Sequence, residues 1–187
     1  MNQYERAIFE VSNALQNYTH KGTYTMYGFG GIPRYLPNHE TDEEQLELVR
    51  CWNLVGEPEK DANGETGGRE PRVEGKIGAL SIYHKAVLNT TFAGPTYFSG
   101  ILRRFLSTVR YGMAKRSKEF FVLCIFTDGF IHDMAETKEL VVTLSYLPVS
   151  IIILGIGDEN FEQMIELDAD SHVLTDKNGR AAARDVI

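Results

Sequence analysis

Two long apolar runs mark the second half of the chain. Residues 120–126 and 149–156 are rich in β-branched and aromatic side chains, and both runs are too short to cross a membrane. Such runs are typical of strands that are buried on both faces of a sheet covered by helices. Residues 134–147 between them repeat leucine and valine at helical spacing and stop at Pro148. We therefore predict a strand–helix–strand unit with two parallel strands.

Helical periodicity elsewhere predicts three longer helices and a short one at residues 160–167. The first helix, near the N-terminus, has an apolar stripe formed by Tyr4, Ile8, Val11, Leu15 and Tyr18. The second, at residues 76–91, has a face formed by Ile77, Leu80, His84, Val87 and Leu88. The third has a core face formed by Phe98, Leu102, Phe105, Leu106 and Val109. We expect His84 to be a packed, hydrogen-bonded side chain, and Thr96 or Ser99 to be the N-cap of the third helix.

Three further segments predict strands, at residues 23–29, 46–55 and 171–174. The glycines that follow the first of them lack the full spacing of a dinucleotide fingerprint, and prolines interrupt what comes next, so phosphate binding is not favoured. Residues 56–72 combine clustered charges, glycine and proline with almost no aliphatic side chain. We expect them to form a mobile loop inserted in a single domain that spans residues 1–187.

The run at 120–126 ends abruptly in Thr127-Asp128-Gly129. Ligands of open α/β sheets bind beyond the carboxyl ends of the strands, and a glycine at that point lets the backbone turn. Asp128 is therefore the first candidate for ion binding or chemistry. The alternative is that Asp128 only caps the next helix, but Asp133 with Glu136 three residues later makes a better capping box.

Charge and cysteine content narrow the function classes. The 187 residues carry a net charge of −7, which argues against nucleic acid and against unaided attachment to anionic lipid, although a bridging cation would reverse the second inference. The two cysteines, Cys51 and Cys124, are expected to be ordinary thiols because Cys124 lies inside an apolar run and nothing indicates secretion. With no signal peptide pattern, a cytoplasmic location is expected.

Two classes of function remain open. In a binding module, a hard cation such as Mg²⁺ held by oxygens at the sheet edge leaves one coordination position for a partner's carboxylate. An enzyme needs a nucleophile with a base or a metal-binding helix, yet the sequence has no Gly-x-Ser-x-Gly, no His-Glu-x-x-His and no phosphate loop. We therefore expect a non-enzymatic protein-binding module, with a metal-assisted enzyme as the alternative.

Six blocks of sequence carry a resemblance to a known family. They lie at residues 4–8, 27–34, 94–99, 127–134, 147–157 and 167–170. Among them are Tyr-Gly-Phe-Gly-Gly-Ile-Pro-Arg, Gly-Pro-Thr-Tyr-Phe-Ser and Thr-Asp-Gly-Phe-Ile-His-Asp-Met. In this order, and over nearly the whole chain, they resemble the C-terminal von Willebrand factor A-type domain of the copine family.

The resemblance implies a doubly wound α/β fold of the Rossmann type, with a mostly parallel sheet flanked by helices. It also implies a protein-interaction module with a metal-ion-dependent adhesion site for Mg²⁺ or Mn²⁺. By the same resemblance Thr96 and Asp128 are metal ligands, and Ser99, Asp133 and Asp158 are candidate accessory ligands. The family is also linked to calcium-dependent phospholipid binding, which its two C2 domains provide.

The chain departs from the family pattern at the metal site. Domains of this type begin with a central strand that ends in Asp-x-Ser/Thr-x-Ser, and no Asp-x-Ser-x-Ser occurs here. We therefore expect an N-terminally truncated domain with an incomplete site, weak binding of Mg²⁺ or Mn²⁺, and self-association or strand capture through unfilled edges. The C2 domains are also absent from this chain, so we expect membrane association only in a full-length protein that carries them. Some plant copine-like domains accompany a ubiquitin-ligase RING, and a ubiquitin-ligase-associated domain is a further alternative, although the RING spacing is missing here.

Overall fold

The computed structural model describes residues 1–34, 51–55, 71–92, 94–116, 118–168 and 173–187. The chain divides into two compact units, Met1–Gly94 (unit 1) and Pro95–Ile187 (unit 2), each of which is described by itself. The organisation as one domain stays a prediction. Most of the predicted loop at 56–72, and half of the predicted strand at 46–55, lie outside the described residues.

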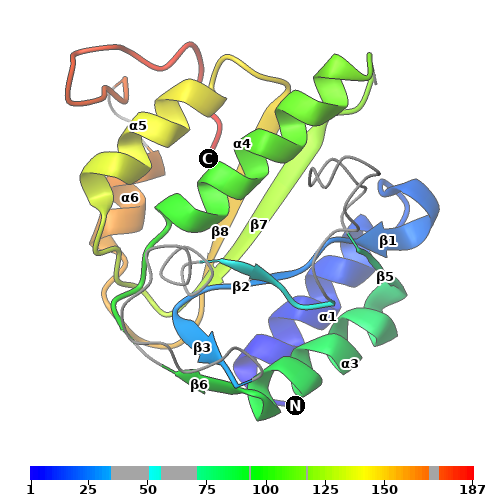
Figure 1. The fold of residues 1–187 in the computed structure, drawn as a ribbon. Coiled ribbons are helices and arrows are strands. Elements are labelled where there is room, and N and C mark those ends of the chain that lie inside the picture. Colours follow the sequence, from blue (N-terminus) through cyan, green and yellow to red (C-terminus); the bar gives the residue numbers. More distant parts are fainter. Residues whose placement is uncertain (35–50, 56–70, 93, 117, 169–172) are drawn as a thin grey trace. The chain divides into compact units, whose positions relative to one another are not determined.

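Two long helices lie in the described part of unit 1 (Figure 1). Helix α1 (Gln3–Leu15) begins with a capping box, in which the Asn2 side chain accepts from the Glu5 amide at 2.8 Å and the Glu5 carboxylate accepts from the Asn2 amide at 2.7 Å. It packs against α3 (Gly75–Leu88), with the rings of Tyr4 and Tyr83 stacked 6.5 Å apart. Tyr18, predicted as the end of the apolar stripe, lies beyond α1 and is exposed.

The predicted face of α3 is wrong. Ile77 and Leu88 are exposed, whereas Ala79 is buried. His84 is also exposed, and it is hydrogen-bonded as predicted, with Nε2 2.7 Å from the Glu5 carboxylate. Apolar side chains occur all around this helix, so its sequence does not single out one face.

Unit 1 contains short antiparallel strand pairs. The predicted strand at 23–29 is broken into β1 (Thr23–Tyr24) and β2 (Tyr27–Gly28), which pair with β5 (Val73–Glu74) and β4 (Trp52–Asn53) respectively. After the glycine turn, β3 (Gly31–Pro33) pairs with β6 (Thr90–Phe92). Gly28 is needed for close packing, because a Cβ there would lie 2.5 Å from the ring of Trp52.

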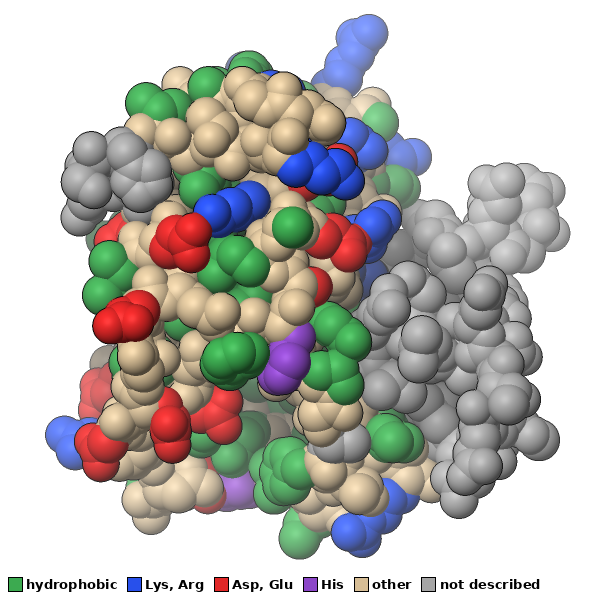
Figure 2. All heavy atoms as spheres, turned by 90° about the vertical axis from the view of Figure 1, so that its left-hand side faces the viewer, with side chains coloured by type: hydrophobic (Ala, Val, Ile, Leu, Met, Phe, Trp, Pro, Cys, Tyr) green, Lys and Arg blue, Asp and Glu red, His purple; other side chains and the backbone are tan. Residues whose placement is uncertain are grey.

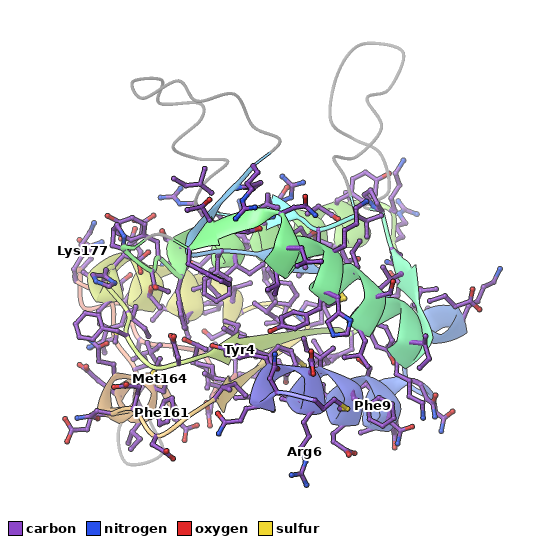
Figure 3. The ribbon with its side chains drawn as sticks, turned by 90° about the horizontal axis from the view of Figure 1, so that it is seen from below. Tyr4, Arg6, Phe9, Phe161, Met164 and Lys177 are labelled. Atoms are coloured by element: carbon purple, nitrogen blue, oxygen red, sulfur yellow. The ribbon has the colours of Figure 1, made fainter. Side chains whose placement is uncertain are left out.

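Unit 2 is built around the predicted strand–helix–strand unit. Strand β7 (Phe121–Thr127) and strand β8 (Val149–Gly155) are parallel and in register over their whole length, and α5 (Met134–Leu144) connects them. Helix α4 (Ser99–Ala114) packs against α5, and both lie on one side of the strands (Figures 1 and 3). The short α6 (Glu162–Asp168) lies toward the other side (Figure 3).

The core of unit 2 confirms most of the predicted apolar faces. The predicted core face of α4 is buried throughout, as are Val141 and Leu144 of α5. The N-cap residue of α4, however, is Phe98 rather than Thr96 or Ser99, and the Phe98 side chain makes no capping hydrogen bond.

The prediction that both strands are buried on both faces is wrong within the described structure. Leu123, Ile125 and Ile151 are buried, but Val122 is 45% exposed and Ile152 is 43% exposed. The alternation follows the pleat, because successive residues of a strand point to opposite faces of the sheet.

The C-terminal tail is fixed to unit 2 by polar contacts. The buried Asp176 carboxylate accepts from the Asn178 and Arg180 amides and from the Arg180 guanidinium, and these bonds hold its pKa below the usual range. Further along, the Ile151 amide donates to the Val186 carbonyl at 2.6 Å. The predicted strand at 171–174 lies half outside the described residues, and Leu174 within it is buried but not in a strand.

The chain thus has an α/β fold. The described sheets are two-stranded, and only the β7–β8 pair among them is parallel, so a single doubly wound sheet stays a prediction. Among the described helices, none has the length and apolar character needed to cross a membrane.

Candidate functional site at the carboxyl end of β7

The turn after β7 is shaped by a buried hydroxyl and a glycine. The Thr127 side chain is buried, and its Oγ1 accepts from the Gly129 amide at 3.3 Å. Gly129 has φ +128°, and a Cβ there would lie 3.1 Å from the Asn160 carbonyl oxygen. Only glycine satisfies both conditions without strain. The turn leaves Asp128 exposed at the strand end, five residues before the Asp133 N-cap of α5, so Asp128 does not cap that helix.

A second loop is joined to this turn by reciprocal backbone contacts. The His132 amide donates to the Thr96 carbonyl at 3.1 Å, and the Thr96 amide donates to Nδ1 of the His132 ring at 3.1 Å. The same Nδ1 lies 3.2 Å from the Thr96 carbonyl, so either protonation state of that nitrogen finds a partner on Thr96. We call this pair of contacts the Thr96–His132 clasp.

Asp133 joins the same two segments. Its carboxylate accepts from the amides of Phe98 at 2.9 Å and Ser99 at 2.8 Å, and from the Thr137 hydroxyl at 3.3 Å. Asp133 therefore caps the N-terminus of α4, and its negative charge lies where a helix dipole favours it. The predicted capping box of Asp133 with Glu136 is wrong, because Asp133 makes no side-chain cap bond to α5 and Glu136 pairs with Arg103.

The loop after β8 and the first turn of α6 also contact this turn. The side chain of Gln163 accepts from the Ile131 amide at 2.8 Å and donates to the Ile131 carbonyl at 3.3 Å. The Phe161 ring fills the space beside Gly155, where a Cβ would lie only 2.7 Å from it; Phe161 and Met164 are labelled in Figure 3. Asp158, in the same loop, is exposed.

Aromatic rings surround the clasp. The Phe130 and His132 rings meet edge to face at 4.7 Å, and the Tyr97 and His132 rings do so at 6.4 Å. Phe130 is nevertheless 60% exposed. A large apolar side chain that is both exposed and held in place is typical of a contact residue in a protein interface.

Comparison with known proteins identifies the family of this arrangement. The sequence model of the family described as Copine matches residues 1–187. This chain belongs to the copine family. It is 34% identical to Protein BONZAI 2 of Arabidopsis thaliana over 188 aligned residues, which cover 100% of this chain and 29% of that relative.

Relatives from two other organisms have similar identity. Copine-C of Dictyostelium discoideum is 30% identical, with 98% of this chain and 30% of the relative covered. Nicotinic receptor-associated protein 1 of Caenorhabditis elegans is 33% identical, with 100% and 26% covered. This copine-family chain therefore spans less than a third of the length of these relatives.

The predicted metal site depends on the oxygen donors that the described residues place around Asp128. Among the described residues, no group of three or more His, Cys, Asp or Glu side chains could hold a metal ion. The Asp133 carboxylate accepts three hydrogen bonds, and Ser99 is buried as the first residue of α4. Six or more oxygen ligands are usual for Ca²⁺ or Mg²⁺, several of them from water for Mg²⁺. The assignment of Thr96, Asp128, Ser99, Asp133 and Asp158 as ligands stays a prediction.

The structure joins predicted site residues through His132 and Gln163, which the sequence analysis missed, and through Asp133, which it named as a cap of α5 and a candidate accessory ligand but not as a contact to α4. His132 holds the Thr96 loop, Asp133 holds the start of α4, and Gln163 holds Ile131. The sequence contained one signal for the role of His132, because this residue ends the Phe-Ile-His stretch that follows Asp128 and Gly129. Both cysteines are free, as predicted, and burial raises the pKa of the Cys124 thiol to about 11, which favours the thiol over the thiolate at neutral pH.

Proposed function

We propose that this copine-family chain is a non-enzymatic protein-interaction module, and that the partner binds at the carboxyl end of β7. The observation that carries the proposal is the Thr96–His132 clasp. It fixes two loops in one arrangement and leaves Asp128 and Phe130 exposed beside each other in sequence.

Preorganisation is the physical reason to place the partner there. Association costs less when the contacting loops are already ordered. Asp133, Gln163 and the clasp all restrain the segment that carries Phe130. An aromatic side chain two residues after a carboxylate then offers apolar contact area on the same turn as a directional polar group.

The name of one relative supports the class of function. One relative is named for association with a nicotinic receptor, which is a protein partner of that relative. The partner of the present chain is a protein of its own cell, in the cytoplasm. Binding to phospholipid, if it occurs in a longer protein, belongs to C2 domains outside these 187 residues.

A metal ion has a secondary part in the proposal. Thr96 and Asp128 are the residues that would contact Mg²⁺ or Mn²⁺, and with so few donors the affinity of this chain is weak. Partner binding by this chain therefore rests mainly on the protein surface.

Comparative affinity capture tests the proposal. The chain and its variants Phe130→Ala, Asp128→Ala and Ile165→Ala would be used to capture proteins from cell extract, with Mg²⁺ or with a chelator. Ile165 is the matched control, because it is 69% exposed on α6. We expect at least one protein whose capture falls about tenfold or more with Phe130→Ala and is unchanged with Ile165→Ala, since exposed aromatic anchors dominate interface energies. Capture that is equal for all variants would exclude this surface.

A further inference from the structure

The Gln163 side chain binds both backbone groups of one residue in the turn after β7. Its carbonyl oxygen accepts from the Ile131 amide at 2.8 Å, and its amide nitrogen donates to the Ile131 carbonyl at 3.3 Å. In an antiparallel ladder, a residue of the neighbouring strand exchanges the same two bonds with its partner. Ile131 lies outside the described strands, so Gln163 takes the place of a strand partner for this residue.

The residue that Gln163 binds lies at the centre of the proposed binding turn. Ile131 is 2% exposed, so its side chain belongs to the core of unit 2, whereas its neighbours Phe130 and His132 are exposed. His132 forms the clasp with Thr96, and the Phe130 ring meets the His132 ring edge to face at 4.7 Å. The backbone conformation at Ile131 therefore decides the direction in which both neighbouring rings point.

Helix α6 has contacts of its own that do not involve Gln163. Met164 and Leu167 are buried and anchor the helix in the core of unit 2. At its N-terminal end the Asn160 side chain accepts from the Glu162 amide at 2.8 Å, which satisfies a helix amide that has no partner inside the helix. Loss of the two Gln163 bonds should therefore loosen the turn and leave α6 in place.

The two bonds need an acceptor and a donor at the end of one side chain. The primary amide of glutamine offers both, and that of asparagine is one methylene shorter. An ionised glutamate offers acceptors alone, so at position 163 it would keep the bond from the Ile131 amide and lose the bond to the Ile131 carbonyl. A protonated glutamate has an O–H group that can donate to this carbonyl again.

We infer that Gln163 is a positioning residue for partner binding, which acts through Ile131 to hold Phe130 and the Thr96–His132 clasp in the arrangement that the partner binds. The inference rests on the proposed function, because it names the side chain that preorganises the same surface. Gln163 acts without touching the partner. A turn whose central residue is released samples other conformations, and binding must then supply the cost of ordering it.

Amide hydrogen exchange followed by nuclear magnetic resonance tests the step from Gln163 to the turn in the intact 187-residue chain. Gln163→Met keeps the length of the side chain and loses both bonds, so protection of the Ile131 amide should fall about tenfold or more, while that of the Leu167 amide in α6 is unchanged. Gln163→Glu should exceed the methionine variant in protection, and should approach the parent as the pH falls through about 4 and the carboxyl regains its donor. Unchanged Ile131 protection in Gln163→Met, or a glutamate variant that matches Gln163→Met at every pH, would overturn the inference.

The capture assay connects the turn to the partner. For the protein whose capture depends on Phe130, we expect Gln163→Met to lower capture about tenfold, because the partner must then order the turn. Glu166→Gln, which removes the ion pair with Lys138 from the same helix, is the matched control and should leave capture unchanged. Equal capture by Gln163→Met and the parent would overturn the inference and leave the proposed function standing. If no captured protein depends on Phe130, the proposed function fails and the inference fails with it.

Discussion

Units 1 and 2 are similar in length but are built from different interactions. The β7–β8 ladder of unit 2 runs over seven residues in each strand, whereas the strands of unit 1 are two or three residues long. The described buried apolar side chains of unit 1 are Ile8, Pro33, Cys51, Trp52 and Ala79, while unit 2 contributes the larger part of the buried core. Unit 1 also has polar contacts such as the capping box of α1 and the Glu5–His84 contact between α1 and α3.

Within unit 2, the elements that provide stability differ from the loops that we propose to bind a partner. In unit 2, one rigid pair of strands with helices over one face holds the loops that carry Thr96, Asp128 and Phe130. Charged side chains of both signs lie next to each other on the α5 and α6 side, as Figure 2 shows, and the Lys138–Glu166 and Lys177–Glu139 contacts are among them. Such exposed pairs add little to stability, so the buried strands and helices remain the main source of it.

The largest effect is expected in the core of unit 2. Ile125→Asp buries an unpaired carboxylate at a position that is 2% exposed, which costs several kcal/mol and is comparable to the stability of a whole domain. We expect this variant to lose its cooperative thermal transition in far-ultraviolet circular dichroism. Ile152→Asp, at 43% exposure, should melt much closer to the parent. Equal melting of the two variants would refute the assignment of a buried and a half-exposed face to this sheet.

The next effect is expected at the cap of α4. Asp133→Ala removes a carboxylate that accepts from the Phe98 and Ser99 amides, so the free energy of unfolding should fall by about 1–3 kcal/mol. Asp133→Asn keeps an acceptor and should lose less. Urea unfolding followed by circular dichroism measures both variants. If alanine costs no more than asparagine, Asp133 is not the cap that the geometry indicates.

A smaller effect, confined to unit 1, concerns acid. The Glu5 carboxylate is hydrogen-bonded to the Asn2 amide and to His84. These two bonds, the one from Asn2 foremost, hold the pKa of Glu5 below its usual value. A carboxyl whose folded-state pKa is lowered contributes stability above its unfolded-state value, and this contribution is lost as the pH falls through the folded-state pKa. The N-terminal end of α1 should therefore loosen on acidification below about pH 4.

The single tryptophan provides the measurement for unit 1. Trp52 is buried in β4, so its fluorescence reports on this unit during urea unfolding. The acid sensitivity of the midpoint should be smaller in Glu5→Gln, which keeps the side-chain shape of the capping box but cannot titrate. An unchanged acid sensitivity would assign the effect to other groups.

The smallest effect is expected for metal. Calorimetric titration of this chain with Mg²⁺ or Mn²⁺ should give a dissociation constant weaker than about 1 mM, because one hydroxyl and one carboxylate supply too little charge. Joining an upstream strand that bears Asp-x-Ser-x-Ser should tighten binding, and Asp128→Ala should abolish the gain. Tight binding by the present chain would mean that other residues, Asp133 or Asp158 among them, complete the site.

The sequence predicts unit 2 better than unit 1 for a physical reason. The apolar runs of β7 and β8 and the stripe of α4 are long enough for periodicity to identify them. The α3 helix has apolar residues on every side, and the segment at 23–29 is divided between two partners by contacts that lie far away in sequence. An apolar run indicates a buried strand, but it does not indicate which of the two faces a helix covers. For this reason Ile152 was predicted to be buried although its side chain is exposed.

The site was predictable only in part. Asp128 was identified because ligands of open α/β sheets bind beyond the carboxyl ends of the strands, where this carboxylate lies. The roles of Asp133 and His132 were not, because the amides that they bind belong to residues 34 to 36 positions earlier in the chain. Contacts of that range depend on the packing of α4 and α5, which local patterns do not specify.

The central claim, that a partner binds at the carboxyl end of β7, is tested most directly by photo-cross-linking in cells. A benzophenone amino acid would be placed at position 130 in unit 2 or, as a matched control, at position 92 in unit 1, where Phe92 is 75% exposed and Phe130 is 60% exposed. We predict a protein adduct at position 130 that weakens when Asp128→Ala is added, and no corresponding adduct at position 92. The same adducts at both positions, or adducts at position 92 alone, would contradict the account.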